Sequence, residues 1–247
     1  MRRLKRLAFA IFLICLGPFL VVACGKVNIS SDWRTADRSP QGLAPLPADE
    51  SVAVVQVYAA RAFHWRGIFA VHTWLAIKPA HAVQYTVHQV LGWQERRGLP
   101  VVVSTADHPD RSWYGNAPEL LLDIRGQRAT SLIPKIEQAI ASYPYEMEYT
   151  MWPGPNSNTF VAHVAREVPE LGLELPTTAI GKDYLNNGKV FARAPSNTGW
   201  QLSLFGILGL TLAAEEGIEA NILSANFGVD FSPIAVKLPG IGRVGAN

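Results

Sequence analysis

The sequence predicts an α+β fold, in which an antiparallel sheet packs with two main helices and a β-rich extension follows at the C-terminus. Three observations support this prediction. Runs of β-branched residues of strand length dominate residues 51–103, two stretches with helical apolar spacing follow, and short strand-like runs return after residue 200. The chain has 247 residues, 49% hydrophobic and 17% charged, which is enough for one substantial core.

Composition divides the chain into four segments. Residues 1–24 combine a basic cluster with an apolar run, as in a secretory signal or a membrane anchor. Residues 25–50, rich in Ser, Pro, Asp and Ala, predict a tether without a core of its own. Residues 51–194 form the predicted α+β core domain. We expect residues 195–247 to be an extension that packs on the core, with the lipid surface as an open alternative.

The end of the apolar run indicates how the chain is held at a membrane. Val21-Val22-Ala23 stands directly before Cys24 and resembles the lipobox of bacterial lipoproteins, which implies lipidation of Cys24. The alternative is an uncleaved helix, because Leu7 to Ala23 is just long enough to span a bilayer. Both alternatives predict a membrane-lipid partner and a bacterial envelope protein with its domain outside the cytoplasm, on the periplasmic face.

Charge and cysteine usage exclude several functions. The formal net charge of +2 includes four basic residues ahead of the apolar run, so the remainder carries −2 and offers no basic stripe for nucleic acid. Cys15 and Cys24 are the only cysteines, so the body has no disulfide, thiolate metal site or cysteine nucleophile. Asp107, His108 and Asp110 lack a further ligand at a recognisable spacing, and we predict no metal and no cofactor.

The first half of the core reads as strands. They are expected at Val52–Tyr58, Gly67–Ile77 and Val83–Trp93, with shorter pieces at Val101–Val103 and Leu120–Ile124. Lys78 to Ala82 breaks the second strand from the third, which predicts an antiparallel hairpin. In that hairpin His72 lies opposite His88 or Gln89, within one residue of register.

Two helices and further strands follow. Apolar spacing from Thr130 to Tyr143 predicts the first helix, which Pro144 ends. Phe160 to Val168 predicts the second, which starts after the rigid turn Trp152–Pro155 and stops before Pro169. Two strands are expected beyond residue 200, at Leu208–Ala213 and Ile218–Leu223.

The start of the second helix is the candidate active site. Asn156, Ser157 and Asn158 are all good N-cap residues, so the Ser157 hydroxyl lies beside free backbone N–H groups that would stabilise an oxyanion. Serine needs a base, for which we select His72, with His88 or Gln89 as the group that orients it. The simpler interpretation is that the triplet only caps a helix and that His72 is a buried core histidine.

Five residues are candidate contacts for a substrate. Trp152 flanks the turn, and the Lys182-Asp183 pair follows in an extended loop. Trp152 is also consistent with simple core packing, and the Lys-Asp pair with pairing to each other. The predicted substrate-binding residues are Trp152, Asn156, Asn158, Lys182 and Asp183.

Three ordered motifs resemble a known bacterial family. They are Ala70-Val71-His72-Thr73-Trp74, the segment from Trp152 to Phe160, and Ala179-Ile180-Gly181-Lys182-Asp183-Tyr184. Together they resemble the domain of unknown function numbered 3750, from about Asp32 to the C-terminus. That family has no established activity.

A more distant likeness implies a fold and a chemistry. A histidine on an early strand, followed much later by Asn-x-Asn-x-Phe at a helix start, resembles the circularly permuted papain-like hydrolases. In those enzymes the residue matching Ser157 is a catalytic cysteine, and the one matching His72 is its base. The resemblance implies a serine-type hydrolase or acyltransferase acting on an envelope amide or ester. The alternative is a non-catalytic, membrane-tethered binding or structural protein with a degenerate site.

Overall fold

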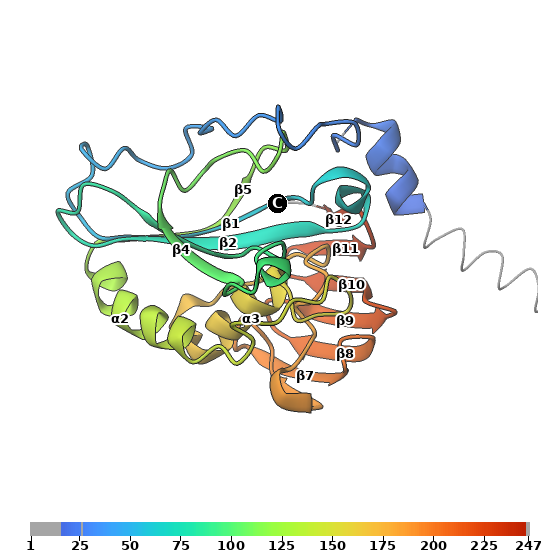
Figure 1. Cartoon of the computed structure of the whole chain (residues 1–247). Coiled ribbons are helices and arrows are strands. Elements are labelled where there is room, and N and C mark those ends of the chain that lie inside the picture. Colours follow the sequence, from blue (N-terminus) through green and yellow to red (C-terminus); the bar gives the residue numbers. More distant parts are fainter. Residues whose placement is uncertain (1–15, 26, 246–247) are drawn as a thin grey trace, which may run out of the picture.

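The structure is a computed structural model that describes residues 16–25 and 27–245 (Figure 1). Most of the predicted signal or anchor, residues 1–15, therefore lies outside the described residues. Residues 16–23 form a helix that ends just before Cys24. In the part of the chain that is described, no helix combines the length and apolar character that a membrane crossing requires.

The predicted α+β class is confirmed. The core holds a five-stranded antiparallel sheet in the order β4-β3-β2-β1-β5. Its strands are β1 (Val54–Arg61), β2 (Val71–Lys78), β3 (Thr86–Val90), β4 (Val102–Ala106) and β5 (Glu119–Arg125). Short 3₁₀ helices precede β2 and β4, namely η1 (His64–Ile68) and η2 (Glu95–Arg97).

The predicted hairpin forms, but its predicted register is wrong. Leu75 pairs with His88 and Ala76 with Val87, so His72 is opposite neither His88 nor Gln89. The connection between the strands explains the difference. It continues from residue 79 to residue 85, so β3 begins later than the sequence pattern indicated and the pairing slides along β2.

Strand alternation gives the five-stranded sheet two different faces. On one, here called the helical face, Val55, Val57 and Leu75 pack with helix residues in a single aliphatic core. On the other, here called the aromatic face, the buried cluster includes Tyr58, Trp74 and Tyr85. Adjacent residues of β2 therefore belong to different environments.

Two helices cover the helical face, as predicted. They are α2 (Gln127–Ala141) and α3 (Ser157–Glu167), followed by η3 (Pro169–Leu171). Each buries a face of small and aliphatic residues, such as Ile136 of α2 and Val161 of α3, against β1 and β2. Figure 1 shows both helices on the same side of the sheet.

The predicted tether is packed on the core. Residues 27–50 run along the aromatic face, where Ala44 packs against the aromatic cluster. The Asp110 carboxylate accepts hydrogen bonds from the backbone N–H groups of Leu43 (2.7 Å) and Ala44 (3.3 Å). Tyr85 also donates to the Pro45 carbonyl oxygen at 2.9 Å. These contacts make the segment a cover for the aromatic face of the sheet.

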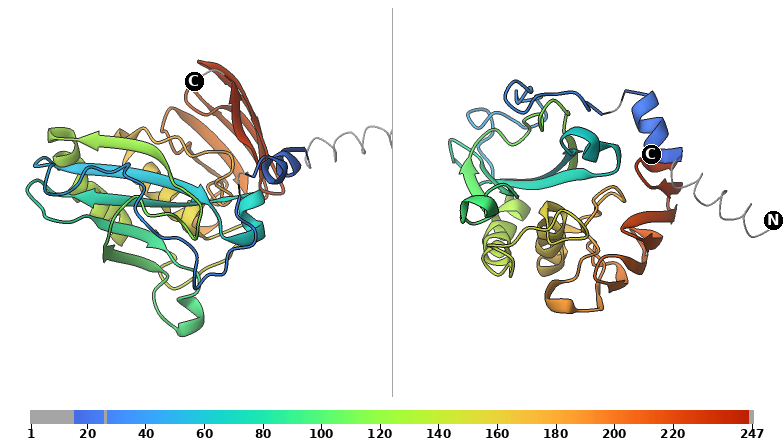
Figure 2. Two further views of the ribbon diagram at one scale, coloured as in Figure 1. Left: turned by 90° about the horizontal axis from the view of Figure 1, so that it is seen from above. Right: turned by 45° about the vertical axis from the view of Figure 1, so that its right-hand side comes forward.

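The C-terminal extension is a seven-stranded antiparallel meander in which every strand pairs with its neighbours in sequence. The two predicted strands are confirmed, and five more flank them. The strands are β6 (Phe191–Arg193), β7 (Gly199–Leu204), β8 (Leu208–Ala213), β9 (Gly217–Ile222), β10 (Ala225–Phe231), β11 (Ile234–Leu238) and β12 (Gly242–Gly245), after η4 (Asn186–Gly188). The meander lies next to α3, as the views in Figure 2 also show.

Candidate functional site

Asn156 caps α3. Its backbone is extended, and its side-chain oxygen accepts hydrogen bonds from the backbone N–H groups of Asn158 (2.9 Å) and Thr159 (3.2 Å). The Thr159 hydroxyl accepts in return from the Asn156 N–H at 3.1 Å, which completes a capping box. Ser157 is therefore the first residue of the helix, as the sequence predicted, but the N–H groups of Asn158 and Thr159 that follow it are bound to the Asn156 side chain and are not free to stabilise an oxyanion.

The amide groups of Asn156 and Asn158 hold the surrounding chain together. The Asn158 amide donates to the carbonyl oxygens of Ile180 (2.7 Å) and Val71 (3.0 Å). The Asn156 amide donates to Ile180 as well, at 3.1 Å, and to Met151 at 3.2 Å. Both side chains are buried and connect β2, α3 and the loop around residue 180, whereas the sequence pattern predicted that they contact a substrate.

Thr73 is the β2 residue that faces the start of α3. Its hydroxyl donates to the Asn158 side-chain oxygen at 2.9 Å and lies 3.3 Å from the Ser157 carbonyl oxygen. In the described residues, no side chain forms a hydrogen bond with the Ser157 hydroxyl. The serine is thus placed beside a helix start but has no base within hydrogen-bond reach.

His72 lies on the aromatic face, opposite to Ser157. Its ring stacks on Trp113 with a centroid separation of 3.7 Å, and Trp74 lies on the same face at 5.6 Å. Thr73, the next residue, contacts α3 on the helical face, and successive side chains of a strand point to opposite faces. The sheet itself therefore separates the imidazole from the serine, and the predicted pair does not form.

The two predicted orienting residues also lie on different faces. Gln89 contacts His72, with 3.3 Å between its Oε1 atom and His72 Nε2. His88, whose strand partner is Leu75 in the aliphatic core, belongs to the helical face and has its Nδ1 atom 2.7 Å from the Ser104 hydroxyl. Its Nε2 atom is buried without a hydrogen-bond partner. His88 therefore cannot orient His72.

Burial keeps both imidazoles neutral. It lowers the pKa of His72 to about 4, although the hydrogen bond to Gln89 acts in the opposite direction. Burial also lowers the pKa of His88 to about 4. A base with so low a pKa would be a weak proton acceptor at neutral pH, whatever its position.

Lys182 and Asp183 are buried in contacts with the seven-stranded sheet. The Lys182 ammonium lies 2.5 Å from Glu219 and 3.6 Å from Asp183. Burial alone would lower the pKa of Lys182, but the two carboxylates outweigh it and raise the pKa. Asp183 accepts hydrogen bonds from Asn221 (2.8 Å) and Asn226 (2.9 Å). The predicted substrate-binding pair is therefore a structural link between the two sheets.

Trp152 is the one exposed member of the predicted substrate set. About half of its surface is accessible, and its indole N–H donates to the Leu223 carbonyl oxygen at 3.4 Å. Leu223 lies in the turn between β9 and β10. Trp152 therefore bridges the turn before α3 and the C-terminal sheet.

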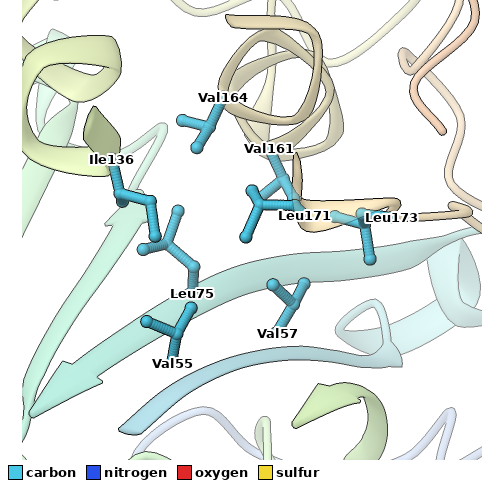
Figure 3. Close-up of a pocket in the computed structure, with 8 residues that line it drawn as sticks. All are labelled: Val55, Val57, Leu75, Ile136, Val161, Val164, Leu171 and Leu173. Carbon is cyan, nitrogen blue, oxygen red and sulfur yellow. The ribbon is translucent and has the colours of Figure 1, made fainter. Parts of the chain in front are cut away.

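Two cavities of the described structure lie away from Ser157. One, of about 10 Å³, is a gap in the aliphatic core between α3 and β1–β2 (Figure 3). It holds at most about one water molecule and has no polar lining. A hollow of about 240 Å³ lies around His163 and Arg166, towards the other end of α3. Within the described residues, no group of three or more His, Cys, Asp or Glu side chains could hold a metal ion.

Neighbouring substitutions at the start of α3 should have very different effects. We expect Asn158→Ala to reduce the free energy of unfolding by about 2–3 kcal/mol, because it removes the closer acceptor of the buried Thr73 hydroxyl and the side-chain donor to the Val71 carbonyl oxygen. Ser157→Ala should change it by less than about 0.5 kcal/mol, because no side-chain hydrogen bond is lost. Urea denaturation of both variants measures the difference. Equal effects would contradict the assignment of Asn158 as the structural residue.

These features define an α+β protein in which the start of α3 packs on β2 and, within the described residues, no base forms a hydrogen bond with the Ser157 hydroxyl. The chain belongs to the family described as protein of unknown function (DUF3750), whose model matches residues 52–184. The matched range contains the five-stranded sheet, α2, α3 and the Lys182-Asp183 link, and it ends before β6. No curated protein and no solved structure matches the chain significantly.

Proposed function

We propose that this chain is a membrane-tethered envelope protein whose α+β domain is a non-catalytic binding or structural module. The observation that carries this proposal is the placement of Thr73 against the start of α3, with His72 on the opposite face of β2. An alcohol that lacks a base has no route to losing its proton near neutral pH. Ser157 therefore occupies the position of a nucleophile but does not act as one.

A permuted papain-like framework is part of this proposal. It is supported by a helix that begins with Asn-Ser-Asn-Thr-Phe and packs its start on a strand far earlier in the sequence. The nucleophile position is kept at the first residue of that helix. The residue that reaches it from the strand is a threonine, which supports loss of catalysis within a retained framework.

The competing function is a serine hydrolase or acyltransferase. The position of Ser157 at the positive end of the helix dipole favours it, although the N–H groups of Asn158 and Thr159 are bound to the Asn156 side chain. The reaction would require His72 to pass through a sheet whose two faces are both packed. That requirement makes the non-catalytic function the better supported one.

A fluorophosphonate probe tests the choice on the purified full-length protein. We expect no covalent labelling of the wild type, and none of the Ser157→Ala or His72→Ala variants, in intact-mass spectra. Labelling of the wild type that disappears in Ser157→Ala would overturn the proposal. A loss of labelling in His72→Ala with an unchanged melting temperature would further identify His72 as the base.

The tether is proposed from the N-terminal sequence. Four basic residues precede the apolar run, and Cys24, which follows it, is exposed in the structure. We expect metabolic labelling with palmitate to depend on Cys24 and to be lost in Cys24→Ala. Persistent labelling of that variant would exclude acylation at Cys24, and the uncleaved segment would then be the tether. Cell fractionation of both forms should find the protein in membranes.

A further inference from the structure

A sheet that covers a core normally turns its apolar face inward and its polar face towards solvent. The seven-stranded sheet has the opposite arrangement. On the face turned away from α3, a row of directly paired residues, one from each strand, crosses the sheet from β7 to β12. Every residue of this row is apolar. Each of these side chains is between 40% and 50% exposed. The row consists of Trp200, Leu212, Ile218, Val229, Val236 and Val244.

The adjacent row on the inner face is polar and buried. Glu219 is its centre and lies within 3.0 Å of both Lys182 and Lys237. Lys237 also contacts Asp230 at 2.7 Å, and Asp183 binds the neighbouring asparagines of β9 and β10. Because this inner face is fully engaged with charged and amide groups, the sheet cannot turn over to bury its apolar face.

The exposed apolar face is too large to be incidental. Strands lie about 4.8 Å apart, so the row alone extends over roughly 24 Å, and the next row on one side is also apolar, with Leu202, Leu210, Ala220 and Phe227. Single exposed aliphatic residues are common on soluble domains, but a continuous apolar sheet face marks an interaction surface.

The membrane attachment lies at one end of this sheet. The helix of residues 16–23 packs on the turn between β11 and β12: Val21 is buried, and a Cβ atom on Gly17 would lie 1.9 Å from the Pro239 carbonyl oxygen. Figures 1 and 2 show this helix beside β11 and β12. Arg61 fastens the same turn to the core through the Gly240 carbonyl oxygen at 2.6 Å. An uncleaved apolar segment would therefore place the bilayer at this end of the sheet, and Cys24, the acylation candidate, directly follows the same helix.

The other end of the row carries aromatic and cationic groups. Phe191 stacks on Trp200 with a centroid separation of 4.8 Å, and the Arg193 guanidinium lies 3.8 Å from the Trp200 ring centroid. Tryptophan and arginine together are typical of side chains that lie at the boundary between lipid headgroups and acyl chains.

We propose that the outer face of the seven-stranded sheet is a membrane-docking surface, which lies flat on the bilayer that holds the N-terminus. This inference rests on the tether proposed above and adds the orientation of the domain to it. A second copy of the chain would also bury apolar surface. We favour the bilayer because the N-terminal tether brings it next to the sheet in every tethered molecule.

A fluorescent label at two matched positions tests the proposal. Ile218→Cys places the dye in the apolar row. Val83→Cys places it on the exposed turn after β2, which is separated from η1 by the whole length of that strand, about 26 Å. Both are made in full-length protein with Cys15→Ser and Cys24→Ser, labelled with an NBD dye and reconstituted into vesicles of phosphatidylcholine and phosphatidylglycerol. Quenching is measured with aqueous iodide and with nitroxide-labelled phosphatidylcholine, and flotation reports binding to the vesicles.

We expect the dye at position 218 to show blue-shifted emission, several-fold weaker quenching by iodide and strong quenching by the nitroxide lipid. The dye at position 83 should remain open to iodide. If the protein floats with the vesicles while both dyes respond alike to iodide, the docking surface is wrong and the tether stands. Protection at position 218 without nitroxide quenching would indicate a second copy and would also overturn docking on lipid. Because Cys24→Ser removes the acylation site, failure to float would contradict both the docking surface and an uncleaved tether, and palmitate labelling at Cys24 would then test the acylated tether separately.

Discussion

Replacing Glu219 with alanine should reduce the free energy of unfolding by about 3–5 kcal/mol, the usual cost of removing one partner from a buried ion pair. Glu219 is almost completely buried and is the carboxylate shared by the Lys182 ammonium at 2.5 Å and the Lys237 ammonium at 3.0 Å. Without it, each ammonium loses a close counter-charge inside the protein. Asp183, at 3.6 Å from Lys182, and Asp230, at 2.7 Å from Lys237, would compensate only in part.

Glu215→Ala is the matched control, because Glu215 is exposed in the turn before β9 and its carboxylate forms no ion pair in the described structure. That variant should stay within about 0.5 kcal/mol of the wild type. Denaturation in guanidinium chloride, followed by tryptophan fluorescence, measures both. If Glu219→Ala were no more destabilising than Glu215→Ala, the buried network would not hold the two sheets together, and Lys182 and Asp183 would again be candidates for binding.

The parts of the fold that depend on local patterns could be predicted from the sequence. Apolar periodicity located α2 and α3, because a helix that buries one face must repeat its apolar residues every three to four positions. The Asn-Ser-Asn triplet located the start of α3, because side-chain oxygens that bind free N–H groups are favoured there. β-Branched runs located the strands of the core in the same way.

The geometry of the site was predicted wrongly, because it depends on which face of β2 meets α3. His72 and Thr73 are adjacent on β2, so only one of them can face α3. Thr73 does, and His72 therefore faces Trp113 on the opposite side of the sheet. Strand alternation carried a usable signal: it groups His72 with Trp74, and Thr73 with the aliphatic Leu75 that would be expected to face a helix. The contact between His72 and Trp113 joins segments that no local pattern relates.

The C-terminal sheet was only partly predicted for a different reason. Its strands alternate strictly, as in Trp200-Gln201-Leu202-Ser203-Leu204, which is typical of a strand with one buried face. Such a pattern is normally interpreted with the apolar side inward. Here the polar residues are buried, because Lys182 and Asp183 place charge against the inner face and require polar partners.

Acidification should destabilise the protein between pH 7 and pH 5, mainly through its buried histidines. The pKa of His72 is about 4 in the folded chain, compared with 6.5 for an ordinary histidine, and the pKa of His88 is also about 4. Because the folded pKa is depressed, the unfolded chain binds more protons between these values, and stability rises with pH. The full contribution is present above pH 6.5 and is lost as the pH falls towards 4.

Each histidine should therefore lower the free energy of unfolding by about 2 kcal/mol between pH 7 and pH 5, and by about 3 kcal/mol once the pH is below 4. His72→Phe keeps a ring on Trp113 but removes the titration, so its free energy of unfolding should fall by about 2 kcal/mol less than that of the wild type over the same range. Urea denaturation at the two pH values gives both slopes. An unchanged slope in His72→Phe would mean that the imidazole is hydrated or can move out of the aromatic face, which is also the motion that catalysis by His72 would require.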